Sequence, residues 1–192
     1  MSESTRSTVG AVAAPPTVSA RERTVTWDDP LVTAAAAREM TGLEFLTAVR
    51  DGRLPKPPIA ALMGFTLTRV ELGRVTFTAE VGEHLYNPIG SVHGGVFCTL
   101  LDSAMGCAVH STLPLGSGYT TVDLNVTLVK GLTVETPTVT AVGEVISVGR
   151  RVATASGRLL ARDGTLHAHA TTTCLVLTPG AGANGGATTR QA

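Results

Sequence analysis

Among the residues that could do chemistry, we consider Asp102 first. Between Glu83 and Lys130 the chain has no Lys or Arg, and its only acids are Asp102 and Asp123. Asp102 falls within a segment predicted to be helical, and a carboxylate in apolar surroundings is costly unless it is paired, solvated or protonated. Two interpretations therefore stay open: a base or nucleophile at a functional site, or an acid that faces water or a distant backbone group.

A second candidate is the segment His93-Gly94-Gly95, which precedes this helix. Glycines at the start of a helix allow a ligand to approach the backbone closely. The first N–H groups of a helix have no intrahelical acceptor and lie at the positive end of its dipole, so they can polarise a carbonyl oxygen. Loss of one such oxyanion donor typically costs ~2.7–4 kcal/mol of barrier. Taken alone, however, this segment is better explained as a plain loop before a helix.

The spacing of these two candidates sets a geometric problem. Asp102 follows Gly94 by eight residues, which corresponds to ~12 Å along a helix. A straight helix cannot bring both groups to one reacting carbon. The acid must therefore serve a site across a subunit boundary or at a bent start of the helix, and both possibilities stay open.

Asp123 competes with Asp102 for the catalytic role. It alternates with Thr121 and Asn125 in a predicted strand, so all three side chains are expected on one face. We rank it second, as a structural acid that forms hydrogen bonds.

Metal and disulfide chemistry find little support. His167 and His169 should share one strand face, but no third ligand accompanies them, so we expect two exposed histidines and no metal. The three cysteines, Cys98, Cys107 and Cys174, form no C-x-x-C pair and are expected to be small buried residues in a reducing compartment. The sequence has no G-x-S-x-G, so an α/β-hydrolase nucleophile is unsupported.

The elements that must position these residues follow from hydrophobic periodicity. A helix is predicted over 34–49 and ends at Gly52, and His93 to Ser111 is apolar on nearly every side, which predicts a helix wrapped by protein. Strands are predicted over 65–72, 75–81, 119–129, 139–148, 151–161 and 166–177, with turns at Gly73 and Asp163-Gly164. One helix enclosed by an antiparallel sheet is the simplest packing, which gives an α+β fold.

Composition divides the chain and limits its partners. Residues 1–26 and 179–192 are predicted to be disordered tails, 27–58 a helical lead-in, and 59–178 the main domain. Lys+Arg and Asp+Glu number 15 each, and this neutral balance argues against a nucleic-acid partner. No signal peptide and no stretch of ~20 apolar residues is found, so we expect a cytoplasmic protein without a membrane partner.

Three segments together resemble a known family. They are Asn87-Pro-Ile-Gly-Ser-Val-His93-Gly94-Gly95, Leu101-Asp102-Ser-Ala-Met-Gly106 and Thr121-Val-Asp-Leu-Asn125-Val. They resemble the PaaI-type (phenylacetate-pathway) thioesterases of the hotdog superfamily, over roughly residues 60–177. The combined spacing of H-G-G and the helix acid is fairly specific, whereas H-G-G alone would be weak.

The resemblance implies hydrolysis of an acyl-CoA thioester, without metal or other cofactor, in a homodimer or homotetramer whose sites lie between subunits. Asp102 would be the nucleophile or general base, and Gly94 of the other subunit would polarise the thioester carbonyl. Asn87 would hold the water or the thioester group, Thr121 would orient the attacking water, and His93 would be more structural than catalytic.

Substrate binding is expected to involve the second glycine of the motif and nearby cations. Gly95 would let the backbone approach the substrate alongside His93. Lys130, Arg150 and Arg151 flank the charge-poor stretch and are candidate contacts for the CoA phosphates. A solvated hairpin turn is the competing explanation for Arg150-Arg151.

Two other functions fit the same fold. A hotdog module could bind an acyl-CoA without turning it over, although such a module need not keep Asp102 and Asn87. A hotdog hydratase acting on an enoyl thioester would need a histidine beside the acid, which would make His93 essential.

Overall fold

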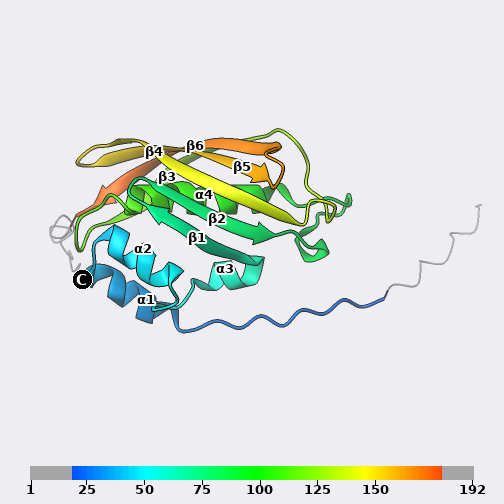
Figure 1. Cartoon of the computed structure of the whole chain (residues 1–192), viewed down its shortest axis with the longest axis horizontal. Helices are drawn as coiled ribbons and strands as arrows, with labels where there is room; N and C mark the ends of the chain where they lie inside the picture. Colours follow the sequence, from blue (N-terminus) through cyan, green and yellow to red (C-terminus); the bar gives the residue numbers. More distant parts are fainter. Residues whose placement is uncertain (1–18, 179–192) are drawn as a thin grey trace, which may run out of the picture.

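The computed structural model describes residues 19–178, which form one six-stranded antiparallel sheet with a long helix on its concave face (Figure 1). The strand order is β1-β2-β4-β5-β6-β3, which leaves β1 and β3 as the edge strands. The strands are β1 (Phe65–Glu71), β2 (Arg74–Glu80), β3 (Gly118–Leu128), β4 (Thr138–Val148), β5 (Val152–Ala161) and β6 (Leu166–Leu177). The predicted strands, and hairpin turns at Gly73 and Gly164 with positive φ, are confirmed.

The central helix α4 (Gly94–His110) confirms the predicted buried helix and with it the α+β class. The sheet wraps it so closely that Leu101, Ala104 and Met105 have no exposed surface. A Cβ added to Gly143 of β4 would lie 2.3 Å from the backbone of Ala104, so glycine is required where helix and sheet touch. None of the helices in residues 19–178 is long and apolar enough to cross a membrane.

The lead-in differs from the single helix predicted over 34–49. It contains α1 (Pro30–Ala36), a 3₁₀ turn (Ala37–Glu39) and α2 (Gly42–Arg50), and α3 (Pro58–Met63) begins at its last residue. The predicted helix is interrupted at Met40, whose backbone is extended. Thr41 then starts a new helix through a capping box with Glu44. Helix α2 ends before Gly52 as predicted, since that glycine has φ +72°.

The lead-in lies against β1 and the C-terminal end of α4 (Figure 1). Gly42 makes this contact possible, because a Cβ there would overlap the carbonyl of His110. The segment before α1 has no helix or strand, but Arg23 donates hydrogen bonds to the carbonyls of Ala61 and Leu62 in α3. The predicted tail at 179–192 and residues 1–18 lie outside the described residues.

Candidate active site

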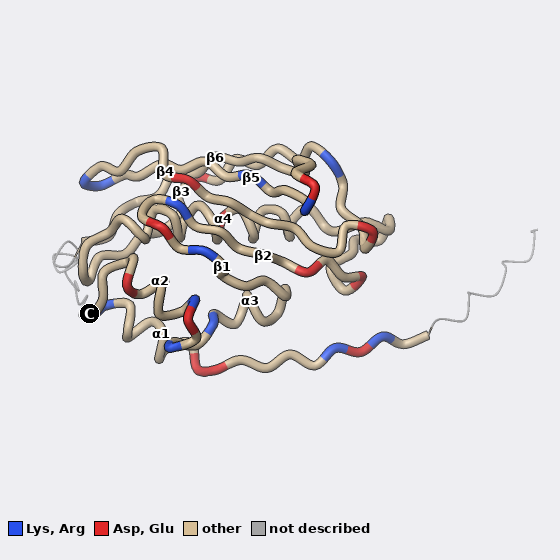
Figure 2. The backbone as a smooth tube through the Cα atoms, in the orientation of Figure 1, with Lys and Arg blue, Asp and Glu red and all other residues tan. Residues whose placement is uncertain are grey.

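Asp102 lies on the one side of α4 that the sheet leaves partly open. Its carboxylate is half-buried, and Thr121 Oγ of β3 donates a hydrogen bond of 2.8 Å to Asp102 Oδ1. Among the described residues, no lysine or arginine lies within ion-pair distance of this carboxylate, although seven such contacts occur elsewhere. The structure thus presents an oriented carboxylate without a cation to neutralise it, and Figure 2 shows how few charges surround α4.

A β-bulge in β3 explains why Thr121 reaches this carboxylate and Asp123 does not. The pairing of β3 with β6 shifts between Thr121 and Asp123, so Val122 is the extra residue. An extra residue reverses the alternation of faces, and Asp123 is exposed while Thr121 is half-buried against α4. The expectation that Asp123, Thr121 and Asn125 share a face was therefore wrong, and within the subunit Asp123 is separated from the site.

Two neighbours of Asp102 were not identified from the sequence as part of this site. Tyr119, two residues before Thr121, packs its hydroxyl onto Gly106, where a Cβ would lie 2.5 Å away. Burial, and then the charges of Cys107 and Asp102, hold the pKa of Tyr119 well above its usual value. Burial also raises the pKa of Cys107 to about 12, with a smaller contribution from Asp102. Both groups are therefore neutral at physiological pH and close to the carboxylate. The sequence offered one signal of this contact, which is a glycine at position 106, one helical turn after Asp102.

The start of α4 separates the roles of the two glycines. The ring of His93 caps the helix, because its Nδ1 accepts a 2.9 Å hydrogen bond from the Gly95 N–H. The Gly95 N–H is thereby occupied. Among the described residues the Gly94 N–H has no acceptor, so it is the first-turn donor left free for a ligand.

The side chain of Asn87 is engaged with its own loop. Its Oδ1 accepts hydrogen bonds from the N–H groups of Ile89 and Ser91, at 3.0 and 3.3 Å, and its Nδ2 donates to Ser91 Oγ at 3.1 Å. This arrangement shapes the turn that precedes the H-G-G segment. One N–H of the amide remains for a ligand, since a primary amide carries two.

Within one subunit, Gly94 and Asp102 are not brought together. Helix α4 is continuous from Gly94 to His110, and β3 runs beside it in the opposite direction. Thr121 contacts Asp102, whereas Leu128 at the far end of β3 lies 3.2 Å from where a Gly94 Cβ would be. A bent helix start is excluded by this geometry, so Gly94 and Asp102 of one chain do not meet at one reacting carbon.

The proposed phosphate contacts also lie apart. Lys130 follows β3, and its N–H donates to the carbonyl of His167 at the start of β6. Arg150 and Arg151 lie in the β4–β5 turn, where the Arg151 carbonyl accepts from Val176 near the end of β6. Most of a strand, roughly 30 Å, separates the two groups, so one subunit does not combine them. All three are exposed.

The two strand histidines do not share a face. Pairing of β5 with β6 shifts so that His167 is an extra residue, and this bulge turns its side chain inward. His167 is 2 % exposed, with its Nδ1 at 3.1 and 3.2 Å from the carbonyls of Lys130 and Gly131, while His169 is exposed. The prediction of two exposed histidines was wrong for His167, which holds the chain after β3. The cysteines are partly as predicted: Cys174 is buried, but Cys98 and Cys107 are only half-buried.

The architecture and the site now allow a comparison with known proteins. Residues 89–168 match the family model described as the thioesterase superfamily. This segment contains α4, Asp102 and Thr121. The chain is therefore similar to the thioesterase superfamily over the part that contains the candidate site.

Solved structures show a similar resemblance. A phenylacetic acid degradation-related protein of Ralstonia eutropha JMP134, provisionally assigned as a thioesterase, is 26 % identical, with a TM-score of 0.62 over 68 % of this chain and 98 % of that one. A thioesterase family protein of Silicibacter pomeroyi is also 26 % identical, with a TM-score of 0.62 over 69 % and 98 %. The PaaI protein of the E. coli phenylacetic acid degradation operon, 18 % identical, shares the fold with a TM-score of 0.57 over 62 % and 84 %. No curated protein sequence matches this one.

Proposed function

We propose that this protein hydrolyses an acyl-CoA thioester to the free acid and coenzyme A, with Asp102 as the catalytic carboxylate. The observation that carries the proposal is the orientation of Asp102: it is half-buried, held by Thr121 and free of any cation among the described residues. A carboxylate so placed keeps lone pairs available to a substrate. The superfamily match supports the thioester as the bond that is cleaved.

The reaction needs one carboxylate and one backbone donor. As a general base, Asp102 removes a proton from water while the water oxygen attacks the thioester carbon. The Gly94 N–H stabilises the resulting oxyanion. Collapse of the tetrahedral intermediate breaks the carbon–sulfur bond, and the CoA thiolate takes the proton from Asp102.

Nucleophilic action is the alternative role for the same carboxylate. The carboxylate would attack the thioester carbon directly, expel the CoA thiolate and leave an acyl–aspartyl anhydride that water then hydrolyses. Thr121 serves both routes by fixing Asp102 Oδ1, so that the other carboxylate oxygen points to the substrate.

Asp102 and Gly94 are too far apart within one subunit, but they can meet if two subunits pair through β3. This edge strand has 11 residues, and in the described part of the chain it pairs only with β6. Its Val122 is 60 % exposed. A long unpaired strand edge is a template for pairing with a second copy. Two-fold antiparallel pairing would place the Leu128 end of one strand, with its Gly94, beside Thr121 and Asp102 of the other.

The bulge permits a register of this pairing in which Thr121 lies opposite Leu128 of the second copy. Because Val122 is extra, Thr121 occupies the place that residue 122 would hold in a regular strand. Thr121 and Leu128 then lie three places on either side of Asn125, and both face inward as opposite residues of an antiparallel pair must. The two-fold axis of the proposed dimer therefore passes at Asn125. This dimer is the smallest assembly that completes a site, and a homotetramer would contain two of them.

The same pairing joins the separated cations. In an antiparallel dimer, the Lys130 end of one subunit adjoins the end of the other subunit at which Arg150 and Arg151 lie. The nucleotide phosphates of CoA would then meet cations from both subunits, and an anionic nucleotide prefers such a position.

A thiol-release assay on short, medium, long and aryl acyl-CoAs tests the activity. We expect turnover by the wild-type protein and a fall in kcat of at least ~100-fold in Asp102→Asn, which is the size of a general-base contribution. Asp123→Asn is the matched control, because that acid faces away from α4, and it should keep the wild-type rate.

Two outcomes would overturn the proposal. Absence of turnover on the whole panel, with acyl-CoA still bound, would identify a binding module. Wild-type rates in Asp102→Asn would remove Asp102 from the catalytic role.

A further inference from the structure

A buried hydroxyl on the neighbouring strand contacts the β-bulge that turns Thr121 toward α4. Thr172 of β6 is 2 % exposed, and its Oγ donates a 2.8 Å hydrogen bond to the carbonyl of Asp123. Asp123 directly follows Val122, which is the extra residue of the bulge. The bond therefore joins β6 to β3 at the residue where regular pairing resumes.

The surroundings of Thr172 give its hydroxyl a specific purpose. The inward positions on either side of it in β6 are the buried residues Ala170 and Cys174. Burial of a hydroxyl in such a place is costly unless the hydroxyl forms a hydrogen bond. A bulge disrupts the ladder locally, and the Asp123 carbonyl beside it is the acceptor that Thr172 finds. Thr172 thus stabilises this irregular point of the sheet as well as filling space.

The bulge is anchored on both sides. On its N-terminal side, Tyr119 packs its hydroxyl onto the backbone of α4. If Val122 took the inward place of Thr121, the preceding residues would reverse their faces and Tyr119 would leave the core. On its C-terminal side, the anchor is the hydrogen bond from Thr172. Thr121 lies between the two anchors, so its position relative to Asp102 depends on both.

We propose that Thr172 is a positioning residue for the hydrolysis. Its hydrogen bond to the Asp123 carbonyl holds the bulge, and the bulge places Thr121 Oγ against Asp102 Oδ1. The inference rests on the proposed thioesterase function, and Thr172 acts through Thr121. A small displacement of a catalytic group slows the chemical step, so the effect of Thr172 belongs to kcat.

Thr172→Val tests this role, because it keeps the shape of the side chain and removes the donor. We expect kcat to fall roughly 5-fold, which is the ~1 kcal/mol of one neutral hydrogen bond expressed as a rate. KM should stay within about 2-fold of the wild-type value, since uniform binding of the substrate is unchanged. Thr172→Ser restores the hydroxyl and should recover most of the rate, which a loss of packing alone would not allow.

Thr112→Val is the matched control. Thr112 Oγ also donates to a main-chain carbonyl, that of Val109 at 2.7 Å. Val109 lies seven residues, or ~10 Å of helix, beyond Asp102. The control should lower the free energy of unfolding, measured in urea, and leave kcat unchanged. An equal fall of kcat in both variants would show a general effect of lost stability and would overturn the positioning role.

A double variant tests whether Thr172 acts through Thr121. In a Thr121→Val background no hydroxyl remains to be positioned, so adding Thr172→Val should change kcat by less than about 2-fold. If the second change again lowers kcat by its full ~5-fold, Thr172 acts independently of Thr121 and the inference is wrong.

The outcomes separate this inference from the proposed function. If the wild-type protein hydrolyses acyl-CoAs and Thr172→Val keeps the wild-type kcat, the positioning role falls and the thioesterase proposal stands. If the wild-type protein hydrolyses none, both fall. Should Thr172→Val fail to fold, Thr172→Cys replaces it, because a thiol is a weaker donor. Its kcat should then lie below that of Thr172→Ser, and a wild-type value would overturn the inference.

Discussion

At the scale of single residues, the site depends on how one carboxylate is held. Asp102 receives a hydrogen bond from Thr121 and no ion pair among the described residues. A cation at this distance would stabilise the charged form and weaken it as a base. The Thr121 hydroxyl orients the carboxylate without adding a charge beside it.

Thr121→Val should lower kcat about 10-fold or more, because a hydrogen bond to a charged group contributes ~1.5–3 kcal/mol. The change keeps the volume of the side chain, so KM should change less than kcat. Thr121→Ser, which restores the hydroxyl, should recover most of the rate. Steady-state kinetics on one acyl-CoA measures all three proteins, and an unaffected kcat in Thr121→Val would contradict the positioning role.

His93 should prove structural. His93→Ala removes the acceptor of the Gly95 N–H and should destabilise the protein by ~1 kcal/mol, as loss of an N-cap does. Hydrolysis should fall by less than the ~100-fold expected for a general acid or base. Urea unfolding and thiol release measure the two effects, with His93→Asn as a variant that keeps a capping acceptor. Loss of all turnover in His93→Asn would contradict a purely structural role for the histidine.

His110 should make stability depend on pH. It is 9 % exposed between Phe45 and Tyr119, its Nε2 has no hydrogen-bond partner within residues 19–178, and burial lowers its pKa below 6.5. Because the unfolded chain then binds a proton more readily than the folded one, stability should fall as pH drops below about 6.5.

The melting temperature between pH 7.5 and 5 tests this dependence. The decrease should be smaller in His110→Gln, which stays neutral throughout. His84 also has a lowered pKa, caused by burial and by Arg23, so His84→Gln is the control. It should retain the part of the decrease in melting temperature that His110 causes. Glu44, Asp51 and Asp163 have lowered pKa values and would act only at more acidic pH, below about 4.5. Equal slopes in wild type and His110→Gln would refute the assignment.

At the scale of elements, the contact between α4 and β4 decides how the site is supported. Gly143 lets the helix backbone approach β4, and Gly106 lets Tyr119 of β3 approach the helix. These two close contacts fix α4 between the central and edge strands. The position of Asp102 relative to Thr121 follows from them.

Gly143→Ala should destabilise the fold by about 3 kcal/mol or more, the upper range for overpacking. The new Cβ would lie 2.3 Å from backbone atoms, which cannot rotate away as a side chain can. Gly118→Ala is the control, since it adds the same methyl group to a strand where nothing lies within 4 Å. Chemical denaturation compares them, and similar stability losses would show that the close contact is unimportant.

At the scale of the whole molecule, the proposed dimer predicts a specific cross-link. Asn125→Cys should form a disulfide-linked dimer on mild oxidation, because residue 125 would face its own copy across the axis at a distance a disulfide can span. Thr127→Cys is on the same exposed face, but its two copies would be ~13 Å apart and should not link. Non-reducing gels and light scattering provide the measurement.

The cross-linking pattern also tests the register. Linking of Thr127→Cys in preference to Asn125→Cys would place the axis elsewhere along β3. A monomeric wild-type protein at all concentrations would remove the dimer, and with it the route by which Gly94 meets Asp102.

The sequence by itself determined the six strands, the central helix and the residues that could do chemistry. Alternation predicted the strands, and an all-round apolar segment predicted α4. These features are encoded by residues close along the chain, so the fold class could be predicted from period alone. The likeness to thioesterases came from the resemblance of three motif segments, since Asp102 and His93-Gly94-Gly95 by themselves left the function open.

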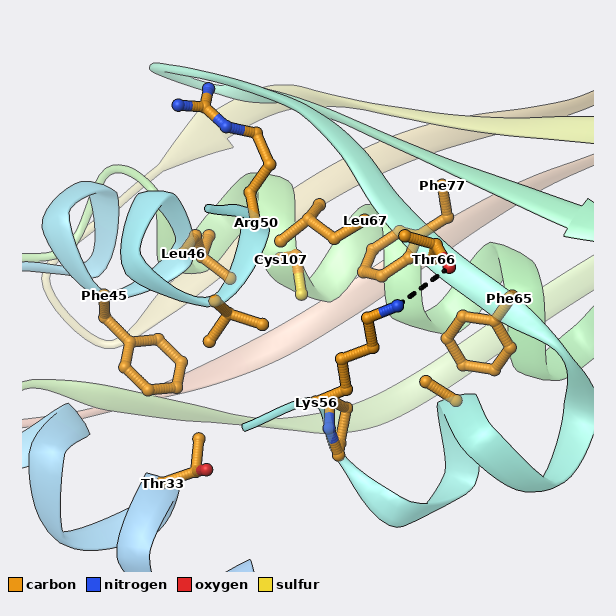
Figure 3. Close-up of a pocket in the computed structure, with 13 residues that line it drawn as sticks. Thr33, Phe45, Leu46, Arg50, Lys56, Phe65, Thr66, Leu67, Phe77 and Cys107 are labelled. Atoms are coloured by element: carbon orange, nitrogen blue, oxygen red, sulfur yellow. Dashed lines mark hydrogen bonds between the residues drawn. The ribbon is translucent and has the colours of Figure 1, made fainter. Parts of the chain in front are cut away.

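Only the tertiary structure decided which side chains meet. The bulges at Val122 and His167 reverse the faces of β3 and β6, because they arise from pairing with strands distant in the sequence. The apolar cavity that α2 and β1 line (Figure 3) likewise depends on how these two elements pack. Periodicity within one segment contains no information about such contacts, since a single extra residue in a ladder or a few ångströms between elements changes them.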